Sequence, residues 1–158
     1  MLTSPRLMNT IAWAAAAALT LAGCAGSGLS APELDVVLSG ASEVPPYSST
    51  AAGKATFWVH SDRTFSGIVE TSGMEASSAY IYLGGPGMVG PVAVELVRTS
   101  SDGPMAMEQI PVSGASWAVP RSARFTDEQY RAFLAGETYV NVHSQRYPEG
   151  EIRGQIRP

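Results

Sequence analysis

Most of the chain consists of short runs of β-branched and aromatic residues, each bounded by Gly, Pro, Ser or Asp. Such runs are typical of antiparallel strands joined by turns. We predict strands over 33–39, 53–60, 64–71, 76–83, 91–99, 105–112, 116–119, 139–144 and 150–157, of which 105–112 and 116–119 have the weaker patterns. About eight short strands with little helix indicate an all-β domain, either a β-sandwich or a barrel.

One helix is predicted, over residues 127–135. Thr126 precedes it and Gln129 lies three residues further on, which is the spacing of a capping box. Tyr130, Phe133 and Leu134 would share one apolar face. Gly136 supplies a left-handed residue at which the helix can end.

The first 23 residues have the features of a secretory signal peptide. An apolar run over 11–21 is too short to span a bilayer, and it ends in Leu-Ala-Gly-Cys at 21–24. These four residues resemble the lipobox of bacterial lipoproteins, whose cysteine is acylated and becomes the new N-terminus. We therefore expect Cys24 to be lipidated and to anchor the protein to a membrane.

The organisation that follows is a signal peptide over 1–23, a flexible tether over 24–32 and one domain over 33–158. Gly, Ser and Ala dominate the tether. Ala25 follows the cysteine where an acidic residue would signal retention in the inner membrane. The resemblance to lipoproteins thus implies the outer membrane, facing the periplasm.

The composition argues against several classes of function. The chain has ten Lys and Arg against fourteen Asp and Glu, a net charge of −4, and its single lysine is Lys54. Nucleic acid is therefore not an expected partner, because its phosphates require clustered basic residues. Cys24 is the only cysteine, so no thiol remains for a disulfide or a thiolate metal site once it is acylated.

Five stretches in order resemble the CHRD domain family, named for its occurrence in chordin. They are 38–46 (LSGASEVPP), 53–55 (GKA), 90–92 (GPV), 134–144 (LAGETYVNVHS) and 150–156 (GEIRGQI). The resemblance covers about 34–156 and implies an immunoglobulin-like antiparallel β-sandwich. The family's biochemical role is poorly defined, so the resemblance implies more about fold than about function. The family commonly has a His-x-His pair before its Gly-rich turn, whereas this chain has Tyr80 and Tyr82.

Alternation sorts the closing strands into two faces, since residues two apart in a strand point the same way. We expect the apolar set to pack inward, namely Ile81, Val140, Val142, Ile152 and Ile156. We expect the other set to form a polar, aromatic-rich face left outside the core, and it is our candidate binding face: Tyr80, Tyr82, Tyr139, Asn141, His143, Glu151 and Arg153.

Three interpretations of this face stay open. It can be structural, with Glu151 paired to Arg153 or a neighbour and His143 bonded to a carboxylate or a tyrosine hydroxyl. It can recognise an envelope protein or a glycan, because tyrosines beside polar groups suit such ligands. His143 is only a weak metal candidate, since a tetrahedral site needs about four ligands and two of the family's histidines are missing.

Other candidate residues have simpler explanations. We expect His60 to be a solvated turn residue, the methionines at 74, 88, 105 and 107 to fill gaps rather than bind Cu(I), and Trp58 and Trp117 to be in the core. Glu149 and Glu151 lie on one face, yet beside an arginine they are typical of a hairpin end rather than a glycosidase pair.

No catalytic constellation and no cofactor motif is recognised. The function predicted is that of a non-catalytic binding or scaffolding module. The alternatives are a copper/zinc redox or superoxide-dismutase-like protein and a purely structural envelope protein.

Overall fold

The computed structural model describes residues 31–99 and 114–158, which form nine strands, one α-helix and one short 3-10 turn. The elements in chain order are β1 (Glu33–Ser39), η1 (Gly40–Ser42), β2 (Ala52–Val59), β3 (Phe65–Ser72), β4 (Ala76–Leu83), β5 (Val92–Glu95), β6 (Val97–Thr99), β7 (Ser116–Ala118), α1 (Asp127–Leu134), β8 (Thr138–Ser144) and β9 (Ile152–Ile156). The predicted all-β class is confirmed. The strand expected over 105–112 lies outside the described residues, and the one expected over 91–99 is divided into β5 and β6.

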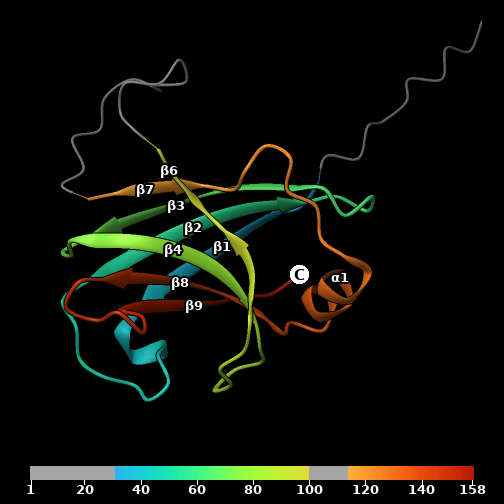
Figure 1. Ribbon diagram of the computed structural model, residues 1–158. Helices are drawn as coiled ribbons and strands as arrows, with labels where there is room; N and C mark the ends of the chain where they lie inside the picture. Colours follow the sequence, from blue (N-terminus) through green and yellow to red (C-terminus); the bar gives the residue numbers. More distant parts are fainter. Residues whose placement is uncertain (1–30, 100–113) are drawn as a thin grey trace, which may run out of the picture.

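All paired strands are antiparallel, in the order β5-β4-β8-β9-β1-β2-β3-β7-β6. The sheet narrows at its middle, where β1 and β9 share one residue pair, Ser39 with Arg153. Two layers result, β5-β4-β8-β9 and β1-β2-β3-β7-β6, and they lie against each other in Figure 1. The architecture is therefore close to that of a sandwich.

Leu96 connects the two edges of the sheet. It is the single residue between β5, one edge strand, and β6, the other. Leu96 is buried, and its N–H donates to the Ala79 carbonyl at 3.0 Å. The chain thus crosses from one layer to the other at this residue and brings the two open edges towards each other.

The core lies between the layers, as alternation predicts. All five apolar residues assigned to it from the closing strands and β4 have 2% or less of their surface exposed. From the other layer, Leu38, Phe57, Val69 and Trp117 are equally buried. Trp58 is only half-buried, because it alternates with Phe57 and so points to the outer side of β2. Its predicted core position is wrong.

Helix α1 begins with the predicted capping box. The Thr126 hydroxyl accepts from the Gln129 N–H at 3.2 Å, and the Gln129 side-chain oxygen accepts from the Thr126 N–H at 2.9 Å. Two donors that the first helical turn cannot pair internally are thus bonded. Gly136 follows the helix with a φ of +71°, the left-handed conformation expected of a C-terminal glycine.

The apolar face of α1 is narrower than predicted. Phe133 is buried and stacks on Phe125 with ring centroids 5.9 Å apart, and Tyr130 is half-buried beside it. Leu134 is 55% exposed, so its predicted place on the packed face is wrong. The helix is short and lies at one end of the two layers (Figure 1), and Phe133 is its one buried residue.

Candidate functional site

Six of the seven residues of the candidate binding face lie on the neighbouring strands β4, β8 and β9. Tyr80 lies opposite Asn141 and Tyr82 opposite Tyr139 where β4 pairs with β8, and Asn141 lies opposite Arg153 where β8 pairs with β9. The side chains of Tyr82, Tyr139, His143 and Arg153 contact one another on one side of these strands. Glu151, immediately before β9, accepts from Ser49 instead.

This face is not left outside. Tyr139, Asn141, His143, Glu151 and Arg153 each have 8% or less of their surface exposed, while Tyr80 and Tyr82 are half-buried. The expectation of a hydrophilic outer layer is therefore wrong. Alternation separates two faces of a sheet, but it does not show whether a loop covers the outer one.

Two loops cover it. From the segment 40–47, Glu43 accepts from the Asn141 amide, and the Tyr47 hydroxyl donates to the Gly150 carbonyl at 2.6 Å. From the Gly-rich turn after β4, the Gly85 carbonyl accepts from Arg153 at 3.0 Å. The polar side chains of β8 and β9 thus bond the loops to the sheet.

Arg153 is held by a ring and a carbonyl. Its guanidinium carbon lies 3.4 Å from the centroid of the Tyr139 ring. A desolvated contact of this kind contributes about 2 kcal/mol. Arg153 Nη2 also donates to the Gln155 side-chain oxygen at 3.4 Å. Burial lowers the pKa of Arg153, and the electrostatic effects of Tyr139 and Glu43 oppose that shift. Arg153 thus bonds to Gly85 and Gln155, whereas Glu151 bonds to Ser49, and the expected pairing of Arg153 with Glu151 is not formed.

Glu43 is the ionisable residue of this cluster that the candidate face omitted. It is 7% exposed, and burial raises the pKa of its carboxyl to about 7, against the opposing effects of Arg153, the Asn141 amide and the Val44 N–H. Asn141 Nδ2 donates to Glu43 Oε2 at 3.3 Å. Within the described residues, Glu43 Oε1 and Asn141 Oδ1 are buried without a partner. A proton on Oε1 would supply the donor that both oxygens lack.

His143 has both ring nitrogens engaged. Nδ1 lies 2.7 Å from the Pro148 carbonyl and Nε2 lies 3.0 Å from the Tyr82 hydroxyl. A carbonyl only accepts, so Nδ1 donates to it, and in the tautomer with its proton on Nδ1 the Nε2 atom accepts from the Tyr82 hydroxyl. Burial raises the pKa of Tyr82 to about 12, so its hydroxyl keeps the proton that it donates.

A metal ion at His143 would displace one of these two partners. In the described part of the chain, no three His, Cys, Asp or Glu residues lie close enough to hold one. Of the methionines considered for Cu(I), Met74 packs half-buried against the core and Met88 is 61% exposed. Met105 and Met107 lie outside the described residues.

The model of the CHRD domain family matches residues 34–156. The chain belongs to the CHRD domain family. In this CHRD domain, the opening and closing motif stretches meet in the buried cluster, since Glu43 comes from the first and Asn141, His143 and Arg153 from the last two. A search of curated proteins and of solved structures finds no match to the chain.

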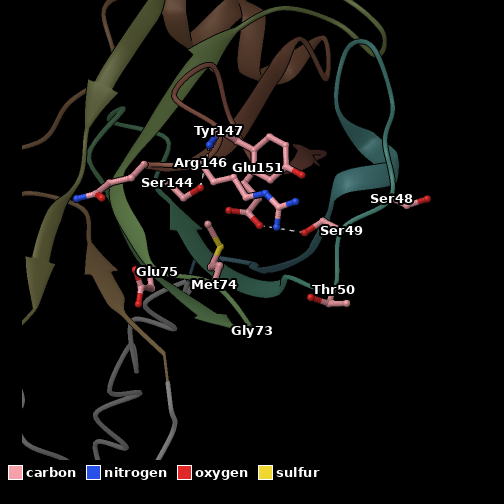
Figure 2. Close-up of a pocket in the computed structure, with 11 residues that line it drawn as sticks. Ser48, Ser49, Thr50, Gly73, Met74, Glu75, Ser144, Arg146, Tyr147 and Glu151 are labelled. Atoms are coloured by element: carbon pink, nitrogen blue, oxygen red, sulfur yellow. Dashed lines mark hydrogen bonds between the residues drawn. The ribbon is translucent and has the colours of Figure 1, made fainter.

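A hollow of about 760 Å³ lies beside the buried cluster, and we refer to it below as the hollow. It is bounded by three segments, 48–50, the β3–β4 turn at 73–75 and the turn after β8 at 144–147, with Glu151 at its inner wall (Figure 2). Its volume is in the range of small-molecule and peptide sites. Of the candidate face, only Glu151 lines it.

A stacked aromatic pair contributes Tyr147 to the wall of the hollow. Tyr47 and Tyr147 stack with centroids 4.7 Å apart, and the Arg146 guanidinium carbon lies 5.4 Å from the Tyr147 ring. Burial raises the pKa of the Tyr47 phenol, and the charges of Glu43 and Glu151 raise it further. The hollow draws on three turns that are distant in sequence, so no single motif predicts it.

The remaining candidates are surface residues. His60 is exposed and makes backbone bonds with Arg63 and Thr64 in the β2–β3 turn. Glu149 is exposed whereas Glu151 is buried, so the two carboxylates do not form a matched pair on one face.

Proposed function

We propose that this CHRD protein is a lipid-anchored component of the bacterial cell envelope whose domain is a non-catalytic binding module. The observation that carries the proposal is the hollow, which is open, polar and charged, whereas the neighbouring polar face is occupied by bonds within the chain. Ligands would therefore bind in the hollow. The Tyr-His-Arg cluster, made of Tyr82, Tyr139, His143 and Arg153, would hold the neighbouring loops on the sheet.

The anchor is assigned to Cys24 on the strength of the lipobox-like sequence. The tether over 25–32 would hold the domain at the membrane surface. Ala25 favours the outer membrane, facing the periplasm. Among residues 31–99 and 114–158, no helix has the length and apolar character needed to cross a bilayer.

The anchor is tested by fractionating cells that express the full chain or Cys24→Ala. The full chain should sediment with membranes and the variant should appear in the released fraction, because acyl chains are the only membrane attachment proposed. Ser27→Ala, three residues away in the tether, is the matched control and should stay on the membrane. If Cys24→Ala remains membrane-bound, the anchor is wrong.

The binding role is tested in the same membranes with a photo-crosslinking residue at Ser48, in the hollow, or at Val37, which is 78% exposed on β1. Adducts should form at position 48 and not at 37. Equal yields at both positions would contradict a ligand site in the hollow. Metal analysis of the same purified protein addresses the copper/zinc alternative, for which stoichiometric metal lost on His143→Ala is the decisive sign.

A further inference from the structure

Glu151 is a buried carboxylate with an oxygen to spare. It is 7% exposed, and its Oε1 accepts from the Ser49 hydroxyl at 3.0 Å. Ser49 Oγ in turn accepts from the Ala51 N–H at 3.0 Å, so its proton is directed at the carboxylate. No hydrogen bond within the described residues reaches Glu151 Oε2. Because Glu151 lines the hollow, this oxygen can accept from a donor that enters there.

A positive group stands at the same wall. Arg146 is exposed at the rim and is held over the Tyr147 ring, and Figure 2 shows its side chain and that of Glu151 directed into the same part of the hollow. Neither residue belongs to the ion pairs that join Lys54 to Asp35 and Arg63 to Asp127. Glu151 and Arg146 therefore each remain available to a ligand group of opposite charge.

Resting on the function proposed above, we propose that the hollow binds a small zwitterion, an amino acid or short peptide with free ends. Its ammonium would donate to Glu151 at the corner made with Ser49, and its carboxylate would accept from Arg146. A guanidinium suits a carboxylate because its N–H groups match both oxygens. Glu75, exposed on the opposite turn, adds a second negative charge and favours the ammonium end.

The test is calorimetric titration of the full chain, in detergent micelles and amine-free buffer, with trialanine and its end-capped forms. N-acetyl-trialanine should bind about tenfold more weakly than trialanine, since it cannot make a charge-assisted bond to Glu151. The binding of trialanine amide should be weakened similarly, because this peptide lacks the carboxylate that Arg146 would bind. Free alanine separates the two sources of this chemistry: equal affinity indicates an amino acid, and weaker affinity indicates a peptide.

Two variants assign the groups. Glu151→Gln keeps an acceptor for Ser49 and should abolish the preference for a free amino end. Arg146→Gln, at an exposed position, should abolish the preference for a free carboxyl end and decides the matter alone if Glu151→Gln fails to fold. Glu70→Gln and Arg157→Gln make the same charge changes at exposed positions outside the hollow and should leave both preferences intact.

Equal binding of capped and free peptides, or no binding of trialanine, overturns the inference. A neutral disaccharide that binds in the hollow while trialanine does not would also overturn it, yet would leave the binding module in place. Failure of the proposed function has a different signature, equal crosslinking at positions 48 and 37.

Discussion

At the scale of single residues, the chain separates two kinds of buried acid. Glu43 lies among atoms of its own fold, where burial raises its pKa to about 7. Glu151 is equally buried but borders the hollow and accepts a hydroxyl bond from Ser49. Glu43 should therefore make the free energy of unfolding depend on pH, whereas Glu151 is available to bind a ligand.

Glu43→Gln should flatten the pH dependence of stability. The folded chain keeps the Glu43 proton up to about pH 7, whereas an unfolded chain loses it near the ordinary value of 4.5. Between these values the folded state binds more protons, so the free energy of unfolding falls as pH rises and the contribution is complete below pH 4.5. The fall should be on the order of 2–3 kcal/mol. Urea melts at pH 4.5, 6 and 8 measure it.

The matched control is Glu70→Gln, an exposed carboxyl on β3 that should leave the slope unchanged. Asp35 and Asp62 have pKa values lowered from 3.8 by their hydrogen bonds, so they titrate below this window. A Glu43→Gln protein with the same slope as the parent would show that Glu43 is ionised at neutral pH in both states.

At the scale of elements, turns and caps hold the polar side chains in place. Gly136 and Gly150 both have positive φ, +71° and +128°, but their surroundings differ. A Cβ on Gly136 would meet nothing within 4 Å, while one on Gly150 would lie 2.4 Å from Asn141 Nδ2. Gly150 thus lets the turn after β8 pass directly over the buried amide.

Gly150→Ala should destabilise the domain more than Gly136→Ala. Both substitutions place a side chain in a left-handed or related conformation, at roughly 1–2 kcal/mol, and only the first also displaces the Asn141 amide. Thermal melts of the two variants should therefore rank Gly150→Ala below Gly136→Ala, which is below the parent. The reverse order would mean that Asn141 and Gly150 are not in contact.

The strands and the helix can be predicted from the sequence better than the loops that cover them. The capping box locates α1, and alternation correctly buries Val140 and Val142, because both signals are local. Alternation wrongly predicts that the opposite side of β8 is exposed to solvent. It gives no sign of the covering loop, because Glu43 lies 98 residues away from the Asn141 that it contacts. The hollow could not be predicted from the sequence for the same reason, because its three bounding segments come together only in the folded sheet.

At the scale of the whole molecule, this CHRD domain has a buried polar cluster and, beside it, an open hollow. The Tyr-His-Arg cluster bonds two loops to the sheet, and the hollow beside it is the part proposed to bind. This division separates residues that support folding from residues that contact a ligand. A variant in each part should therefore affect a different measured quantity.

The most direct test measures trialanine affinity and the free energy of unfolding on the same samples of Tyr82→Phe and Glu151→Gln. Tyr82→Phe removes the hydroxyl that His143 accepts from and should lower the unfolding free energy by about 1 kcal/mol with unchanged affinity. Glu151→Gln should weaken binding by about tenfold in a protein that still folds. Loss of trialanine binding in Tyr82→Phe, with an unchanged free energy of unfolding, would contradict the account. It would mean that the ligand binds at the buried face that includes Tyr82.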